Sequence, residues 1–489
     1  MTNNVNFIDY KLQKKSDQGI DLQNKKLYFE ANKIFSELAI EYTNHFYPRY
    51  LLGTLKIEIE DYSSALDHLL ISLDLNNSHI STYINLAYIY TKLKDYKKTE
   101  DILINGMVID NKNLPLKLNL SLTYLAQGKM NNLIKNDNEI LNISPNNLYV
   151  INRLHELKQP VLNKKLKSNL KKLLKKDKLN PEDKTYANFL FARFKNNEKK
   201  ISLEYEFLMN AHDIIFSNNE KYFKNNNDFI FSKLNNIHEH FDKNINIKDL
   251  NLNTEQLKPI FIFGLPRSGS TILEKILLNS SSDIIACEET KLFNLIADTL
   301  FFNKFDGDIL KCISHIHHEY LKLLNTTQLK VVFTDKSLNN FFFLGWIKLL
   351  FPGAKFINCN RNPYTIISSI IRNNLSNLTW AHQLDDIKSY IDTYYNVTKK
   401  WLDTHELDIY QFYYNNLIQD FDTETKKIFD FCDLRWNEKL KNFNNSEFIS
   451  HTASNIKVRE NFSTNEDNKH HEMSNLLQKK ISADWNTIF

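Results

Sequence analysis

The chain has 489 residues, of which 42% are hydrophobic and 12% aromatic, and its formal net charge is +4. This length exceeds one ordinary core, so two or three domains are expected, while nine glycines and nine prolines argue against a loop-rich or disordered chain. So small a charge in so long a chain does not indicate a nucleic-acid partner. No signal peptide precedes residue 15 and no window resembles a membrane span, which predicts a cytoplasmic protein without a transmembrane segment.

The cysteines show neither metal-ligand spacing nor a disulfide framework, so reduced thiols are expected. They are Cys287, Cys312, Cys359 and Cys432.

A period of 34 residues runs through the N-terminal part of the chain, where Asp61-Tyr62 recurs as Asp95-Tyr96. A series of small residues with the same spacing comprises Gly19, Gly53, Ala87 and Ser121. Coinciding series at this spacing predict helix–turn–helix repeats, in which the small residues let the two helices of a unit approach closely.

The pattern resembles the tetratricopeptide repeat. Four units are expected at about 12–45, 46–79, 80–113 and 114–147, the first being the least regular. The aromatic residue that this family places early in the first helix survives only as Tyr83. The resemblance implies a peptide or protein partner on the concave face of the array, and a purely structural role stays open.

Residues 148–255 are expected to form a helical bridge, with a continuation of the repeats left open. Leucines fall on one face of the segment 162–176 and lysines surround them. This pattern fits a basic helix for a membrane or nucleic acid, but the acidic residues that follow favour a solvated helix face. The polar cluster 224–228 is expected to form a surface loop.

The segment 259–271, Pro-Ile-Phe-Ile-Phe-Gly-Leu-Pro-Arg-Ser-Gly-Ser-Thr, is the most informative part of the chain. It predicts a buried strand, a tight turn and the start of a helix, which together aim backbone N–H groups at a phosphate. Gly264 and Gly269 have the spacing of a nucleotide P-loop, but Ser270 stands where that motif has lysine. Because the positive charge comes instead from Arg267, an ATPase is disfavoured and transfer of another group is expected.

Short β-rich runs alternate with helices in the C-terminal half. Strands are expected at 259–263, 283–287, 330–334, 355–359 and 408–413. Helices are expected at 271–279, 338–350, 363–374, 383–402 and 421–431. The alternation predicts an α/β domain with a mainly parallel sheet, which binds its ligand beyond the carboxyl ends of the strands.

The glycine loop resembles the one that holds the 5′-phosphosulfate of PAPS (3′-phosphoadenosine 5′-phosphosulfate) in sulfotransferases. Arg361 and Ser369 lie eight residues apart, as do the arginine and serine that hold the 3′-phosphate in this family. The resemblance implies a PAPS-dependent enzyme with no metal, and a C-terminal segment similar to the loop that closes over PAPS. The implied donor-binding residues are Arg267, Ser268, Gly269, Ser270, Thr271, Arg361, Ser369, Ser454 and Arg459.

A second motif carries the implied catalytic chemistry. The segment 287–291, Cys-Glu-Glu-Thr-Lys, resembles the Gly-Glu-Glu-Thr-Arg segment of the tyrosylprotein sulfotransferase branch, whose second glutamate is the base. That glutamate corresponds to Glu289, although lysine replaces the arginine and cysteine the glycine. Lys336 lies in a segment similar to the family's Thr-Asp-Lys. With Arg267 it is implied to stabilise charge on the leaving phosphate, while Glu289 removes the acceptor's proton.

Other residues allow two interpretations. Asp335 ends an apolar strand, as the Mg²⁺-binding aspartate of NTPases does, but the missing P-loop lysine argues against that role. The cluster of His315, His317 and His318 fits a metal site or a second base, but the lack of partner ligands favours a solvent-facing helix. Arg372 would either assist the 3′-phosphate or remain on the surface.

The sequence therefore predicts a repeat domain at 1–147, a helical bridge at 148–255 and a sulfotransferase domain at 256–489. Two other functions remain open, a P-loop nucleotide kinase or NTPase and a non-catalytic repeat scaffold. The acceptor hydroxyl is left open between a protein tyrosine, a carbohydrate and a small molecule, because fold and donor site do not determine it.

Overall fold

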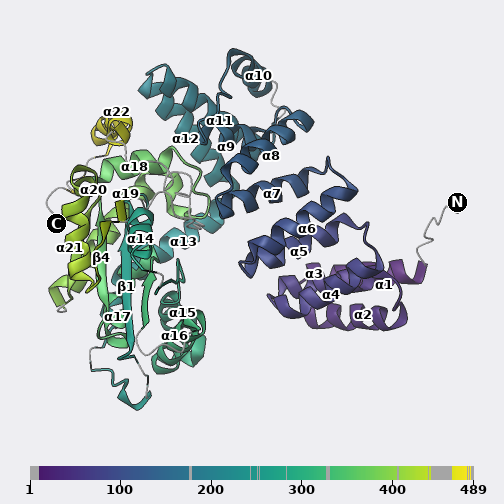
Figure 1. The fold of residues 1–489 in the computed structure, drawn as a ribbon, viewed down its shortest axis with the longest axis horizontal. Helices are drawn as coiled ribbons and strands as arrows, with labels where there is room; N and C mark the ends of the chain where they lie inside the picture. Colours follow the sequence, from purple (N-terminus) through teal and green to yellow (C-terminus); the bar gives the residue numbers. More distant parts are fainter. Residues whose placement is uncertain are drawn as a thin grey trace. The chain divides into compact units, whose positions relative to one another are not determined.

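The computed structural model (Figure 1) describes residues 10–175, 179–242, 244–250, 252, 254–281, 283–325, 331–404, 407–438, 440–441, 465–481, 483 and 485. The chain divides into two compact units, Met1–Gln159 and Pro160–Phe489. Within the described ranges, no helix is both long and apolar enough to cross a membrane.

The first unit is a series of antiparallel helix pairs. Its helices are α1 (Tyr10–Asn24), α2 (Tyr28–Glu41), α3 (Phe46–Glu58), α4 (Tyr62–Leu75), α5 (Ile80–Lys92), α6 (Tyr96–Ile109), α7 (Leu114–Gln127), α8 (Met130–Ile143) and α9 (Leu148–Glu156). The second helices of the four pairs begin at residues 28, 62, 96 and 130, so the 34-residue period of the sequence is also the period of the backbone. The predicted tetratricopeptide-type repeats are confirmed.

The recurring residues have direct structural roles in these pairs. The carboxylate of Asp61 caps α4 by accepting a hydrogen bond from the N–H of Ser64 at 3.2 Å, and Asp95 caps α6 in the same way. A Cβ at Gly53 would lie 2.5 Å from Cγ of Leu69, so only glycine allows α3 and α4 to pack this closely.

The second unit begins with helices and continues into an α/β domain. The helices that precede the sheet are α10 (Lys164–Lys175), α11 (Pro181–Asn197), α12 (Ile201–Asn218) and α13 (Glu220–Ser232). The surface loop predicted at 224–228 is wrong, because this segment lies within α13. One member of the cluster faces the protein: Asn227 is buried, donating to Asp386 Oδ2 at 2.8 Å and accepting from Thr379 Oγ1 at 2.7 Å.

A five-stranded parallel sheet forms the centre of the α/β domain, with strand order β2-β3-β1-β4-β5. The strands are β1 (Leu257–Gly264), β2 (Ile284–Ala286), β3 (Val331–Asp335), β4 (Lys355–Asn360) and β5 (Ile409–Tyr413). All five predicted strands are present, and the prediction of repeats followed by a mainly parallel α/β domain is confirmed. Phe261 and Phe263 pack on one face of β1, whereas Ile260 and Ile262 pack on the other, so helices cover both faces.

The helices of this domain match the prediction less completely. They are α14 (Ser270–Leu278), α15 (Asn294–Phe302), α16 (Ile309–Leu324), α17 (Leu344–Leu350), α18 (Pro363–Ile371), α19 (Leu384–Thr404), α20 (Tyr414–Gln419), α21 (Phe421–Phe431) and α22 (Asn465–Lys480). The helix predicted at 338–350 begins as a 3₁₀ segment over Leu338–Phe343 and becomes α-helical only at Leu344. The helices α15, α20 and α22 were not predicted, and α16 was indicated only by the solvent-facing interpretation of the histidine cluster.

A buried histidine pair joins the helical part of the second unit to the sheet domain. Nδ1 of His212 lies 3.0 Å from Nδ1 of His382, and Nε2 of His212 lies 2.9 Å from the carbonyl oxygen of Ile371 at the end of α18. Both imidazoles are fully buried. Burial lowers the pKa of His212 to about 4 and that of His382 to about 3, so both side chains are neutral at pH 7.

We expect the second unit to lose stability as the pH falls from about 6.5 to about 4. Over that window the unfolded histidines bind protons that the folded ones do not. For His212 the difference between the unfolded and folded pKa values corresponds to about 3 kcal/mol of unfolding free energy. All five tryptophans lie beyond residue 160, so tryptophan fluorescence follows this unit alone. His212→Gln should make the free energy of unfolding depend less on pH, whereas His471→Gln, at an exposed site, should leave that dependence unchanged. If the free energy of unfolding fell equally steeply with pH in the His212 variant and in the unchanged chain, the buried pair would not be the cause.

Candidate active site

Four polar loops meet at one edge of the sheet because β1, β2, β3 and β4 are parallel neighbours. Arg267 follows β1, Glu289 follows β2, Lys336 follows β3 and Arg361 follows β4. The strand order places the loop of Arg267 beside that of Arg361, and the loop of Glu289 beside that of Lys336. This is the edge at which ligands of open α/β sheets bind.

The glycine loop after β1 has a backbone that only glycine can adopt at two positions. Gly264 has φ +139°, and a Cβ there would lie 2.6 Å from the carbonyl oxygen of Cys359 on β4. Gly269 has φ +101° and directly precedes α14, whose first residues, Ser270 and Thr271, are buried. The hydroxyl of Ser268 donates to the carbonyl of Leu265 at 2.6 Å and so stabilises the turn.

Gly269→Ala should destabilise the second unit by about 1–3 kcal/mol, because alanine is strained at positive φ. The new Cβ would also lie 2.6 Å from Cδ2 of Tyr414. Gly353→Ala is the matched control, since nothing lies within 4 Å of its added Cβ, and it should change stability by less than about 0.5 kcal/mol. Denaturant unfolding followed by tryptophan fluorescence measures both, and equal effects would contradict the strain argument.

The two predicted arginines and the predicted serine come together beside this loop. Nε of Arg267 donates to Oγ of Ser369 on α18 at 3.0 Å. One terminal nitrogen of Arg361 donates to the carbonyl oxygen of Arg267 at 3.3 Å, and its guanidinium carbon lies 4.7 Å from the ring centre of Tyr414. Residues separated by about 100 positions in the sequence thus form one cationic cluster at the start of α14.

The other two loops bring a lysine between two carboxylates. Nζ of Lys336 lies 2.9 Å from Oε1 of Glu289 and 3.9 Å from Oε2 of Glu274. Glu274 lies on α14, and its Oε1 accepts a hydrogen bond from Oγ1 of Thr334 at 3.1 Å. Glu274 was not predicted as a site residue. The sequence feature that could have identified it is a carboxylate one turn after Ser270, among residues that otherwise form the apolar face of a helix.

Burial and the neighbouring charges shift the pKa values of Glu274 and Lys336 in opposite directions. Burial raises the pKa of Glu274 to about 7, against the attraction of Lys336 and the hydrogen bond from Thr334. Burial alone would lower the pKa of Lys336, but the carboxylates of Glu274 and Glu289 outweigh it and raise that pKa above its ordinary value. Lys336 is therefore protonated at neutral pH, and its ammonium group is available as a hydrogen-bond donor.

Asp335 is held by hydrogen bonds on both carboxylate oxygens. Oδ2 accepts from the hydroxyls of Thr290 and Tyr320, each at 2.6 Å. Oδ1 accepts from the N–H of Ser337 at 2.7 Å and from Nδ2 of Asn340 at 3.1 Å. A carboxylate committed in this way positions the loop after β3, and no side of it is left for Mg²⁺.

Arg372 forms an ion pair that the sequence did not predict. Its guanidinium forms a bidentate ion pair with Glu204 of α12, at 2.7 and 3.0 Å. A terminal nitrogen also lies 3.2 Å from Nδ1 of His470 on α22. Arg372 thus links three helices instead of extending the cationic cluster.

The histidine cluster lies on α16, as the solvent-facing interpretation requires, but His317 is buried. Among the residues that the structure describes, no group of three or more His, Cys, Asp or Glu could hold a metal ion. Ser454 and Arg459, predicted to bind the donor, lie outside the described residues. The four cysteines are buried, and none of them forms a disulfide.

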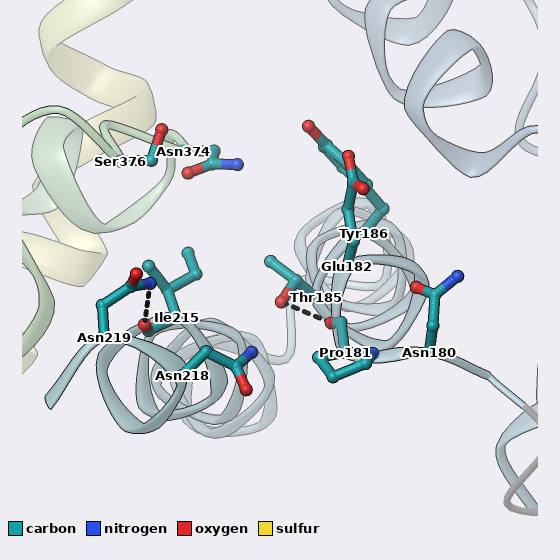
Figure 2. A pocket seen from close by; sticks show the side chains of 10 residues that line it. All are labelled: Asn180, Pro181, Glu182, Thr185, Tyr186, Ile215, Asn218, Asn219, Asn374 and Ser376. Carbon is teal, nitrogen blue, oxygen red and sulfur yellow. Dashed lines mark hydrogen bonds between the residues drawn. The ribbon is translucent and has the colours of Figure 1, made fainter. Parts of the chain in front are cut away.

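A hollow of about 520 Å³ lies elsewhere in the second unit, between α11, α12 and the segment after α18. Figure 2 shows the polar side chains around it, among them Thr185 on α11, Asn218 at the end of α12 and Asn374 in the segment after α18. None of the predicted site residues lines it.

Comparison with known proteins gives the family of the sheet domain. Residues 259–438 match the sulfotransferase family. The matched segment contains the glycine loop, Glu289, Lys336, Arg361 and Ser369, and leaves the repeats and the C-terminal residues outside it. The chain therefore combines tetratricopeptide-type repeats with an α/β domain that matches the sulfotransferase family over residues 259–438.

Individual relatives are distant. An uncharacterized protein of Aquifex aeolicus is 27% identical over 222 residues, which cover 41% of this chain and 29% of that protein, so less than a third of its length is matched. The sulfotransferase domain of an olefin synthase from Synechococcus is 17% identical over 46% of this chain and 96% of that domain, with a TM-score of 0.30. MamA from Desulfovibrio magneticus is 18% identical over 30% of this chain and 82% of its own, with a TM-score of 0.28.

Proposed function

We propose that the chain is a PAPS-dependent sulfotransferase that moves a sulfuryl group to an acceptor hydroxyl. One observation carries the proposal: Arg267, Arg361 and Ser369 form one cationic cluster beside a glycine loop that has Ser270 in the P-loop lysine position. The cluster offers donors for two anionic groups, as a nucleotide phosphorylated at both the 3′ and 5′ positions requires. The match of 259–438 to the sulfotransferase family supports the same conclusion.

The donor-binding roles follow from the chemistry of these residues. The N–H groups at the start of α14, with Ser270 and Thr271, would bind the 5′-phosphosulfate, helped by the helix dipole. Arg361 and Ser369 would bind the 3′-phosphate, for which the planar guanidinium is well suited. The hydrogen bonds from Arg267 to Ser369 and from Arg361 to the Arg267 carbonyl would then keep the two phosphate sites in register.

The proposed reaction is an in-line displacement at sulfur. The acceptor oxygen bonds to sulfur while the sulfur–oxygen bond to the 5′-phosphate breaks, and that phosphate oxygen keeps the electron pair. Glu289 takes the proton of the acceptor hydroxyl, and its partly exposed side chain, with 36% of its surface accessible, lies within reach of an entering acceptor. Lys336 and Arg267 stabilise the charge that develops on the leaving phosphate.

The proposal specifies the acceptor only as a hydroxyl-bearing compound. The likeness of 287–291 to the tyrosylprotein branch favours a protein tyrosine, and the repeat array would offer a surface for such a protein. A carbohydrate hydroxyl is the other candidate. We also propose that the protein is cytoplasmic.

Labelled sulfate transfer tests the proposal directly. PAPS carrying radioactive sulfur is incubated with the purified chain and a lysate of the source cells, and the labelled products are separated into protein, carbohydrate and small-molecule fractions. We expect label in one fraction only when the chain is present. Failure of the purified chain to bind PAP, the desulfated product, would overturn the proposal whatever the acceptor is.

A further inference from the structure

Lys336 lies between two carboxylates of very different exposure. Its side chain is 2% exposed, that of Glu274 is 1% exposed and that of Glu289 is 36% exposed. Glu274 and Glu289 reach the lysine from α14 and from the loop after β2. The lysine can therefore shift on the Glu289 side while keeping Glu274 as its neighbour on the buried side, a carboxyl group that is ionised above its pKa of about 7.

The proposed reaction requires such a shift. The ammonium group of Lys336 lies 2.9 Å from Oε1 of Glu289 and so occupies an oxygen that would take the proton of the acceptor hydroxyl. Lys336 must also reach the leaving phosphate, which draws it away from Glu289. An ammonium group moved within a buried site without a counter-ion is strongly destabilised by desolvation, so a second carboxylate is needed behind it.

Glu274 has the geometry of that second carboxylate. Its Oε2 lies 3.9 Å from Nζ of Lys336, while its Oε1 is fixed by the hydroxyl of Thr334. It also lies on the helix whose first turn forms the proposed phosphate site, so it is held in register with that site. The other ionisable groups that face the pair are Asp335, Glu288 and Cys359, and Asp335 is already committed to four hydrogen bonds.

We propose that Glu274 is a positioning residue: it holds the charge of Lys336 while this lysine moves from Glu289 to the leaving phosphate, and so frees Glu289 to act as the base. This inference rests on the proposed sulfotransferase function. It adds a buried counter-ion that acts only through Lys336 and touches neither donor nor acceptor.

Glu274→Gln tests the proposal, because it keeps the shape and removes the charge. We expect kcat for sulfate transfer to fall by about 10- to 100-fold, as for loss of a charge-assisted contact. The KM for the acceptor should change little. The alkaline limb of the kcat–pH profile should move to lower pH, since burial would then lower the pKa of Lys336 unopposed on that side. PAP affinity, measured by calorimetry across the same pH range, should show the same shift without any turnover.

Two further variants separate positioning from folding. Glu274→Asp keeps the charge, so the alkaline limb of its kcat–pH profile should lie at the same pH as in the unchanged chain. Thr334→Val keeps the carboxylate of Glu274 and should also leave the alkaline limb at that pH. A Glu274→Gln variant that folds, as judged by tryptophan fluorescence, and keeps both pH profiles of the unchanged chain would overturn the inference alone. An unchanged chain that neither binds PAP nor transfers sulfate would overturn the proposed function and this inference with it.

Discussion

Glu289→Gln is expected to lower kcat for sulfate transfer by about 10²–10⁴-fold, the usual contribution of a well-placed general base. The amide retains the size of the side chain but cannot take the proton of the acceptor hydroxyl. The ion pair between Glu289 and Lys336, now at 2.9 Å, would also be lost. Since Glu289 is not among the proposed donor-binding groups, the affinity for PAP should change by less than about threefold, which calorimetry measures.

The neighbouring carboxylate provides the control for this variant. Glu288 and Glu289 are adjacent in the sequence, and it is Glu289 whose Oε1 lies 2.9 Å from Nζ of Lys336. Glu288→Gln is therefore expected to keep most of the activity. A greater loss of kcat in the Glu288 variant than in the Glu289 variant would contradict the assignment of the base.

Arg361→Ala is expected to weaken PAP binding by about 10- to 100-fold, which corresponds to about 1.5–3 kcal/mol for hydrogen bonds to a charged group. The same variant should bind adenosine 5′-phosphate, which has no 3′-phosphate, about as well as the unchanged chain does. Calorimetry with the two nucleotides separates the 3′-phosphate contact from damage to the loop.

Arg361→Ala should also have a small indirect effect on nucleotide binding, through the glycine loop. Arg361 contacts the carbonyl of Arg267 and the ring of Tyr414, so its loss removes two supports of the glycine loop. If both nucleotides lost affinity equally, Arg361 would be a support of the loop and not a ligand of the 3′-phosphate.

The repeats and the sheet were predictable because their signals are local. The 34-residue period follows from residues such as Asp61 and Gly53, each of which acts on a helix a few residues away or on its partner in the same unit. The strands were predictable because a buried parallel strand such as β1 is a continuous apolar run. The helix α13 was not, because its asparagines resemble a loop until Thr379 and Asp386 provide their partners.

The candidate site was predictable where a motif has fixed spacing and not where contacts are long-range. Arg361 and Ser369 could be paired from their separation, and the hydrogen bond between Ser369 and Arg267 agrees with that grouping. Glu274 and the partner of Arg372 could not be predicted. Each depends on an ion pair between elements far apart in the chain, with Lys336 in one case and Glu204 in the other.

The glycine loop with Ser270 is proposed to accept a 3′-phosphorylated adenosine nucleotide and not ATP, and comparative nucleotide binding by the unchanged chain measures this preference. Calorimetry is carried out with PAP, and with ATP in the presence of Mg²⁺, alongside an assay of ATP hydrolysis. We expect tight binding of PAP, weak binding of ATP and no hydrolysis. Tighter binding of ATP than of PAP, or measurable ATP hydrolysis, would contradict it.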